Sequence, residues 1–360
     1  RLKNAVKKGS QSSYGPKFPV IGCIETLEAA RGHDHYKAPL APDQGRGVAT
    51  GYWFNIGGQT SATLNLSEDG SVALVLGTPD IGGSRASLSM MAAEELGIDL
   101  DKVRPIISDT SALGYNMLTG GSRVTFAGGI AVVGAAQDLV GQLCERAAKF
   151  WDIPVEDVEW REGEARATNG HSDNMQPLTL QEIAKDMAKT GGPIVGAHSI
   201  NAQGAGPSFG THVVDVEVDR ETGRVFVTRY TVVQDAGRAI HPGYVEGQYQ
   251  GGAVQGIGWA LNEEYIYDQD GCLENPGFLD YRVPVCSDVP MIDTVIVEVP
   301  NPTHPYGVRG VGETPIVPPM AAISNAVESA LGIRFTELPM SPPRVLAAIN
   351  ASNGNAAKAN

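Results

Sequence analysis

Six stretches of alternating apolar and polar residues are expected to be β-strands, because alternate side chains of a strand point to opposite faces of a sheet. The first two are separated by the turn residues Ser67-Glu68-Asp69-Gly70, which predicts a hairpin. A second hairpin is predicted to turn through residues 219–224. The predicted strands span residues 60–66, 71–76, 103–107, 211–218, 225–233 and 294–299.

Apolar residues at helical spacing, together with start and stop residues, predict the helices. Thr179 and Glu182 have the spacing of a capping box, and Pro242 stands in the first turn of a glycine-rich helix. Gly97 and Gly332 follow the last residues of two helices. The predicted helices span residues 25–31, 84–96, 124–151, 180–189, 242–261 and 319–331, and a last helix begins at Ser341-Pro342.

The order of these elements predicts an α+β fold, because hairpins interrupt any strict alternation of strand and helix. Mixed sheets with packed helices are expected in two subdomains, residues 46–192 and 193–360, and Gly191-Gly192 closes the first. Residues 1–45 are polar and contain prolines, which predicts an extended connecting arm.

The composition argues against several classes of protein. The chain has 360 residues, 42% of them hydrophobic, which is enough for a substantial core. A formal net charge of −14 argues against a nucleic-acid ligand, since such proteins need a basic surface. No stretch approaches the about 20 apolar residues of a membrane span, and the basic run Arg1–Lys8 lacks the apolar part of a signal peptide. Neither export nor membrane insertion is expected.

The sequence gives little indication of a metal site. The cysteines lack the CxxC spacing of zinc ribbons and iron–sulfur clusters, and a reducing compartment, the cytoplasm, is the simplest expectation. His33 and His35 could share a metal ion, but an exposed polar turn is the favoured interpretation. The scattered cysteines are Cys23, Cys144, Cys272 and Cys286.

Two glycine-rich turns lead directly into predicted helices. A helix start leaves backbone N–H groups unpaired and carries partial positive charge, so each turn is suited to bind a phosphate, with an arginine to assist. Glycine also makes tight turns without any ligand, and that interpretation is favoured for either turn alone. Neither turn fits GxGxxG or GxxxxGK[ST], which disfavours a nucleotide-hydrolysing enzyme. The turns are Gly82-Gly83-Ser84-Arg85 and Gly120-Gly121-Ser122-Arg123.

The predicted helix 242–261 contains an unusual number of glycines, each costing about 1 kcal/mol relative to alanine. Such a cost is usually offset by close approach of another helix or of a flat ligand. Gln255 lies among these glycines, and its amide could bind a polar cofactor edge or could simply face solvent. The glycines are Gly247, Gly251, Gly252, Gly256 and Gly258.

The segment GVRGVGETPIVPP places one carboxylate, Glu313, among glycines, prolines and apolar residues. Burial there would raise the pKa of Glu313 towards the range of a general base. An acid in a loop is more often solvated, but the rigid apolar surroundings weaken that alternative.

In combination these segments resemble one family, the molybdenum hydroxylases, which include xanthine dehydrogenase, aldehyde oxidase and nicotinate dehydrogenase. Each segment is weak alone, whereas their order and spacing are specific. The resemblance runs from about residue 47 to residue 349 and corresponds to the carboxy-terminal, molybdopterin-binding half of the molybdenum subunit. The segments are GTPDIGGSR, AAEELGI, DT, TGGSRVTFAGGIAV, DAGRAIHP, VEGQYQGGAVQGIG and GVGETP.

The resemblance implies a molybdopterin cofactor, with the cytosine dinucleotide as one form, whose dithiolene holds molybdenum without a direct protein ligand. Glu313 falls on the family's glutamate beside the metal, where it would take the proton from Mo–OH. The oxygen would then attack an electron-poor carbon of an N-heteroaromatic compound or aldehyde while hydride passes to the sulfido ligand. The implied activity is oxidative hydroxylation with oxygen derived from water.

The family's other site positions also map onto this chain. Gln255 would contact the pterin or a metal oxygen, and the backbones of residues 82–84 and 120–125, Val124 and Thr125 included, would contact the pterin and its phosphate. Tyr52, Trp53 and Phe54 lie where relatives present an aromatic wall to the substrate, although an aromatic run is also ordinary core material. Relatives often have glutamine in the first glycine loop and Asn-Pro in place of His241-Pro242, which leaves the pterin form and the local hydrogen bonds open.

The resemblance also implies partners. The sequence does not include the front half of the molybdenum subunit, so we expect either a split enzyme, whose molybdenum subunit is two chains, or a fragment of a longer subunit, and the chain alone should be inactive. A 2Fe–2S subunit and a flavin (FAD) subunit would carry electrons away in a hetero-oligomer. Two other interpretations remain: a scaffold with this fold but no cofactor, which the acid at Glu313 argues against, and a stand-alone nucleotide-binding protein, which the missing fingerprints argue against.

Overall fold

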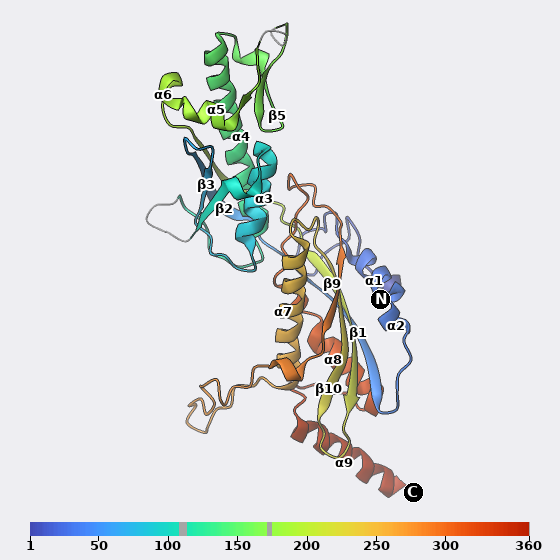
Figure 1. Ribbon diagram of the computed structural model, residues 1–360. Helices are drawn as coiled ribbons and strands as arrows, with labels where there is room; N and C mark the ends of the chain where they lie inside the picture. The colour runs from blue at the N-terminus through green and yellow to red at the C-terminus, as the bar shows by residue number, and fades with distance from the viewer. Residues whose placement is uncertain (108–113, 171–174, 360) are drawn as a thin grey trace. The chain divides into compact units, whose positions relative to one another are not determined.

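The computed structural model describes residues 1–107, 114–170 and 175–359 (Figure 1). The chain forms two compact units that are interleaved along the sequence. Unit 1 contains residues 1–54, 206–300 and 311–360, and unit 2 contains residues 55–205 and 301–310. The sequence predicts continuous subdomains at 46–192 and 193–360, whereas each unit here collects segments that are distant along the chain.

Unit 1 is built on a four-stranded sheet in the order β1-β9-β10-β11. β9 pairs antiparallel with both β1 and β10, and β11 runs parallel to β10. The hairpin of β9 and β10 confirms the prediction for residues 211–233. The strands are β1 (Gln44–Trp53), β9 (Ser208–Val218), β10 (Val225–Asp235) and β11 (Ile292–Val297).

Three helices complete the core of unit 1 on one face of this sheet. Tyr249, Ala253 and Ile257 of α7 (Pro242–Leu261) pack with buried valines of β9 and β10, as do Ala322 and Ile323 of α8 (Pro319–Leu331). The bounds of α7 and α8 are as predicted. α9 (Pro342–Ala359) adds buried residues to the same cluster, and α1 (Cys23–Gly32) covers the opposite face.

Strand β1 is not predicted from the sequence, and its glycines explain both its position and the missed prediction. α8 lies so close that a Cβ at Gly45 or Gly47 would overlap its backbone carbonyls. Only glycine permits this approach, but the three glycines of QGRGVATGYW interrupt its β-branched and aromatic residues and weaken the pattern of a strand. Close helix packing therefore removed the sequence signal for the strand.

The amino-terminal residues, predicted to be an extended arm, instead fold onto unit 1. Phe18 and Leu27 are buried with Phe209 of β9. His35, in α2 (Asp34–Lys37), is also buried rather than in an exposed turn: its Nε2 lies 3.2 Å from Asp215, which Arg46 binds through two hydrogen bonds of 2.7 Å. Burial pushes the pKa of Asp215 upward, but His35 and Arg46 outweigh it and hold that pKa below its ordinary value.

Unit 2 has a four-stranded sheet in the order β4-β3-β2-β8 with two helices packed against it. The predicted hairpin of β2 and β3 is confirmed, and β4 runs parallel to β3 after the crossover through α3. The elements are β2 (Gly58–Leu66), β3 (Val72–Leu76), α3 (Ser84–Leu96), β4 (Val103–Ile107), α4 (Val124–Trp151) and β8 (Val195–Ala202).

A small antiparallel sheet, β5-β6-β7, adjoins the end of α4 within unit 2. The capping box of Thr179 and Glu182 is present as predicted, but the helix it begins is broken at Asp186, where φ is −107°. These elements are β5 (Val158–Arg161), β6 (Glu164–Ala167), β7 (Leu178–Thr179), α5 (Leu180–Lys185) and α6 (Met187–Thr190). The short 3-10 helices are η1 (Leu2–Asn4), η2 (Leu100–Lys102), η3 (Val155–Asp157), η4 (Cys286–Asp288) and η5 (Thr314–Ile316).

Helix α4 is long and apolar enough to span a membrane by length and composition, contrary to the expectation from the sequence. In the fold, Phe126, Leu139 and Leu143 on this helix are completely buried in unit 2. Most of its apolar window is likewise covered by the protein, which is the burial expected of a core helix.

Candidate functional site

Glu313 stands at the start of η5, in the loop that leads to α8. Its backbone is in the helical region, with φ of −95° and ψ of −22°, and its side chain is half-buried rather than fully buried as the sequence suggested. Thr314 and Pro315, which follow it, are buried. The carboxylate therefore stands at the edge of the apolar surroundings that the sequence predicts.

Hydrogen bonds to two strands of unit 1 fasten the Glu313 loop. The buried amide of Gln234, at the end of β10, donates to the carbonyl of Val311 over 3.1 Å. The Tyr249 hydroxyl of α7 donates in turn to the carbonyl of Gln234 over 3.0 Å. On the other side, the Thr314 hydroxyl donates to the carbonyl of Ser208 in β9. These bonds fix the backbone on both sides of Glu313.

Glycines of α7 allow the loop to pack directly against that helix. A Cβ at Gly252 would overlap Pro315, and one at Gly256 would lie 2.5 Å from Cγ of Pro319. The predicted close approach is therefore confirmed for these two positions, and the neighbours are prolines of the Glu313 segment. Gly258 is similarly close to Pro284, whereas Gly247 and Gly251 face open space.

The Gln255 side chain is exposed, and so are most residues at the amino-terminal end of α7. Gln255 does not join the apolar cluster that packs α7 onto the sheet. His241 caps the helix: its Nδ1 accepts from the Tyr244 N–H over 3.3 Å, and the two rings stack at 3.9 Å. This side chain therefore satisfies one backbone N–H at the start of α7.

The three aromatic residues of the predicted substrate wall have different environments. Tyr52 stacks on Phe209 with ring centroids 5.0 Å apart, and its hydroxyl lies 2.8 Å from Oγ of Ser13. Trp53 packs beside Phe54, and its buried indole N–H has no hydrogen-bond partner among the described residues. Phe54 is exposed. Tyr52 is thus a packing residue, while Phe54 is the one available to a ligand.

The first glycine loop, in unit 2, has the backbone expected of a helix start. Gly82 and Gly83 have φ of 66° and 76°. The N-cap residue of α3 is Gly83, so this helix begins without a side-chain cap. Part of the capacity for an anion is already used, because Asp80 accepts from the backbone N–H of Arg85 over 2.9 Å and pairs with its guanidinium at 3.1 Å. Arg85 is therefore committed to a neighbouring carboxylate rather than free for a phosphate.

The second loop is held from inside the protein by Arg123. Gly121 and Ser122 have φ of 65° and 52°, and α4 begins immediately afterwards without a side-chain cap. The Arg123 side chain, predicted to bind an anion, is completely buried, and burial lowers the pKa of its guanidinium. It donates to the carbonyls of Gly57, Gln59, Met117 and Leu118 and to the Thr60 hydroxyl. Only the backbone of Arg123 is left for a ligand.

Close packing also fixes the second loop against its neighbours in unit 2. The N–H of Ile56 donates to the Gly121 carbonyl over 2.9 Å, and Asn55 donates to the Gly310 carbonyl over 3.1 Å. A Cβ at Gly310 would overlap the carbonyl of Ser122, so only glycine fits there. Glu313 follows Gly310 by three residues along the chain.

These features fit a phosphate-bearing cofactor. α4 has 28 residues, begins after left-handed residues, and has neither an acidic residue in its first turn nor an N-cap side-chain bond. Such a start presents backbone donors to an anion. Beside the Glu313 loop, the buried Oε1 of Gln234 has no hydrogen-bond partner among the described residues. The second loop fits better than the first, where Asp80 already occupies the helix start.

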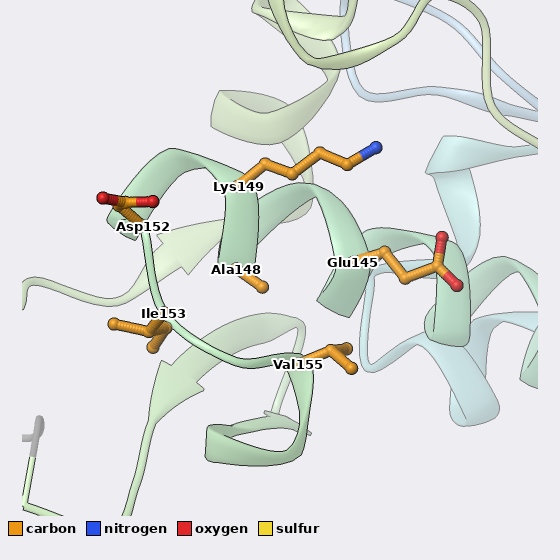
Figure 2. A pocket seen from close by; sticks show the side chains of 6 residues that line it. All are labelled: Glu145, Ala148, Lys149, Asp152, Ile153 and Val155. Carbon is orange, nitrogen blue, oxygen red and sulfur yellow. The ribbon is translucent and has the colours of Figure 1, made fainter.

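Other features of the described chain lie apart from these residues. Figure 2 shows a pocket at the carboxyl end of α4 that contains none of the predicted site residues. Within the described ranges no group of His, Cys, Asp and Glu could hold a metal ion, and the four cysteines are free. The DT segment, residues 109–110, lies outside the described residues. The pocket is lined by Glu145, Ala148, Lys149, Asp152, Ile153 and Val155.

The fold is that of a domain that binds a molybdenum cofactor. The chain belongs to the molybdopterin cofactor-binding domain family, whose model matches residues 27–290. The putative xanthine dehydrogenase molybdenum-binding subunit of Escherichia coli is 31% identical over 365 residues, covering 96% of this chain and 48% of that subunit. The nicotine 6-hydroxylase large subunit of Paenarthrobacter nicotinovorans is 32% identical over 300 residues, covering 80% and 36%.

Solved structures show the same fold. Reconstituted CO dehydrogenase from Oligotropha carboxidovorans superimposes with a TM-score of 0.86 at 22% identity, over 99% of this chain and 48% of that one. The family resemblance, the α+β fold and the molybdopterin cofactor predicted from the sequence are thereby confirmed. The chain spans about half the length of these proteins or less.

Glu313 is singled out by the sequence, but the residues that hold its loop are not. Gln234 and Tyr249 were not singled out, although a glutamine ending the apolar run TVVQ of a strand is a signal for a buried polar role. In the opposite direction, Arg85 and Arg123 were assigned to anions, while the structure engages both with the protein itself. The direction of a side chain next to a glycine turn is not encoded in the local sequence.

Proposed function

We propose that this chain is the molybdopterin-binding part of a molybdenum hydroxylase that oxidatively hydroxylates a C–H bond of an N-heteroaromatic compound or an aldehyde. The observation that carries the proposal is the 31% identity over 96% of the chain to a xanthine dehydrogenase molybdenum-binding subunit. The bound molybdenum–pterin group would supply oxygen transfer and two-electron chemistry, which no amino-acid side chain provides.

Several residues of this chain would have separate roles in binding that group and in the reaction. Backbone N–H groups of residues 120–125 at the start of α4 would bind its phosphate, and the Gln255 amide would bind a polar edge. Glu313 would accept the proton released when oxygen passes to the substrate. The hydrogen bonds on both sides of Glu313 support this role, because a base must keep a constant distance to the atom it deprotonates. Phe54 would contact the substrate ring.

The complete enzyme would need further chains. We infer that it contains the front half of the molybdenum subunit, a 2Fe–2S subunit and a flavin subunit, assembled in the cytoplasm. The support is that the chain spans only 48% of the E. coli relative. Electrons would leave through the iron–sulfur clusters to FAD.

Glu313→Gln in the assembled complex tests the base. The amide cannot accept the proton but has nearly the same shape, so molybdenum and pterin content should be unchanged while turnover falls about 100- to 10,000-fold. Metal analysis and steady-state assays with an artificial acceptor, over a panel of purines, N-heterocycles and aldehydes, measure both. Glu246→Gln, an exposed position on α7, is the matched control and should turn over normally.

Near-normal turnover of Glu313→Gln would refute the assignment of the base. An assembled wild-type complex without molybdenum and without pterin would instead favour a scaffold that has kept the fold and lost the cofactor.

A further inference from the structure

Segment 262–291 connects the end of α7 to β11 and contains almost no regular structure. Figure 1 shows it leaving the end of α7 as a long loop that runs away from β10. Its elements are the isolated bridge between Tyr267 and Leu273 and the single turn of η4. The sequence pattern predicts no helix or strand here.

This segment concentrates exposed apolar side chains. Phe278 is 97% exposed, Leu279 99% and Met291 88%, the three highest values among the large hydrophobic residues of the described chain. Of the 24 exposed large hydrophobics there, eight lie in these 30 residues, so the enrichment is local. A local concentration of exposed large apolar side chains is typical of a surface that another molecule covers. The other five are Tyr265, Ile266, Tyr267, Val283 and Val285.

Hydrogen bonds hold the segment in a definite shape. Asn275 accepts from the Ile266 N–H over 3.0 Å and donates to the Glu264 carbonyl over 2.7 Å, which ties the two sides of the loop together. The Tyr281 hydroxyl donates to Glu263 over 2.8 Å, and the Tyr281 N–H donates to the Gly277 carbonyl over 2.8 Å. Phe278 and Leu279 therefore project from a closed turn and are prepared for contact without further ordering.

The charge of the segment restricts what can cover it. It contains seven carboxylates and one guanidinium, a net charge of −6. A second copy of the chain would bring the same charge to the contact, and juxtaposed like charges are unfavourable at an interface. A complementary surface needs apolar pockets with lysines and arginines around them. The charged residues are Glu263, Glu264, Asp268, Asp270, Glu274, Asp280, Arg282 and Asp288.

We propose that segment 262–291 is the docking surface for the front half of the molybdenum subunit, which would contact it through an apolar patch ringed by basic residues. The proposal rests on the proposed function, since it takes the complementing half from relatives of which this chain covers 48%. Phe278 and Leu279 are the central anchors, because large side chains that become fully buried carry most of the binding energy of an interface.

The test uses this chain and the front half of the subunit, identified by its match to the part of the E. coli relative outside the aligned region, produced as two polypeptides. Phe278→Asp combined with Leu279→Asp should weaken the complex about 100-fold or more, measured by surface plasmon resonance. Thermal unfolding of the free chain should not change, because both side chains are exposed. Leu100→Asp, at another exposed leucine in η2, is the control and should bind as the wild type does.

Hydrogen exchange locates the contact independently. Amides of 262–291 should exchange more slowly in the complex than in the free chain. Equal binding of the double variant and the wild type, or unchanged exchange in the complex, would overturn the proposal. A free chain that dimerises through this segment, with the dimer abolished by the double variant, would overturn it in favour of a second copy.

The docking surface and the proposed function can fail separately. A complex that depends on Phe278 and Leu279 but contains no molybdenum would support the docking surface and refute the proposed function. If the complex contains molybdenum, is active and forms equally well with the double variant, the proposed function would be supported and the docking surface refuted. Asp280→Lys adds a charge test: its added positive charge should slow association several-fold at low salt, and faster association would contradict a basic partner surface.

Discussion

The two units fasten irregular backbone in opposite ways. In unit 1 the Glu313 loop packs against α7 because that helix lacks side chains at the contact: Gly252 and Gly256 let Pro315 and Pro319 lie against it. In unit 2 the second glycine loop is held by a buried cation, since the Arg123 side chain donates to the carbonyls of Gly57, Gln59 and Met117. The first arrangement is sensitive to any added atom, and the second to any lost donor. Both solve the same problem, a buried backbone without regular hydrogen bonds.

Removing the donor in unit 2 should have the largest effect. Arg123→Met replaces the guanidinium side chain by an apolar one of similar length. Four carbonyls and a hydroxyl then lose the donor that Arg123 provides. The free energy of unfolding should fall by about 3–5 kcal/mol. Denaturant unfolding of the full chain measures it. Arg123→Lys retains a cation with three donors and should cost clearly less; an equal cost for both variants would show that packing alone matters at this position.

Acidification should destabilise both units through buried neutral histidines. Burial lowers the pKa of His212, in unit 1, to about 3 and that of His304, in unit 2, to about 4. The unfolded chain therefore binds more protons below pH 6.5, and stability falls as the pH drops from about 6.5 towards these values. Between pH 6.5 and 4.5 each histidine should remove roughly 2–3 kcal/mol.

Urea unfolding at the two pH values measures this loss. His212→Gln and His304→Gln cannot titrate, and each should make the pH dependence shallower. A dependence that neither variant reduces would place the titrating group elsewhere.

Adding volume in unit 1 should have a smaller effect on stability. Gly256→Val places methyl groups where Pro319 already lies, and the overlap should cost about 1–3 kcal/mol and displace the Glu313 loop. Gly247→Ala is the matched control: it lies on the same helix but meets no atom within 4 Å, so it should stabilise by about 0.5–1 kcal/mol. Thermal unfolding ranks the two variants, and a stable Gly256→Val would mean that the loop yields easily.

Prediction from sequence succeeded where the signal is local. The bounds of α4, α7 and α8 follow from helical periodicity, from Pro242 and from Gly332, and all three were predicted. It failed where the partner is distant in the chain. β1 is a strand because β9, about 160 residues away in the chain, pairs with it. Its glycines are required by the close packing of α8 and are not favoured by strand propensity.

The same distinction applies to the candidate site. Glu313 is visible in the sequence because GVGETP is chemically unusual, and family order makes it specific. The amide of Gln234 that fastens its loop comes from a strand 77 residues earlier, and no local pattern joins the two. Likewise, the inward direction of Arg123 depends on acceptors more than 60 residues upstream, at Gly57 and Gln59.

The interleaving of the units constrains how this protein can be recombined. The chain passes from one unit to the other after residues 54, 205, 300 and 310. A single genetic crossover between residues 55 and 310 would therefore join incompatible pieces of core in at least one unit, and exchanging unit 2 intact requires four coordinated breakpoints. Neither unit can therefore be transferred to another protein as one continuous segment of chain.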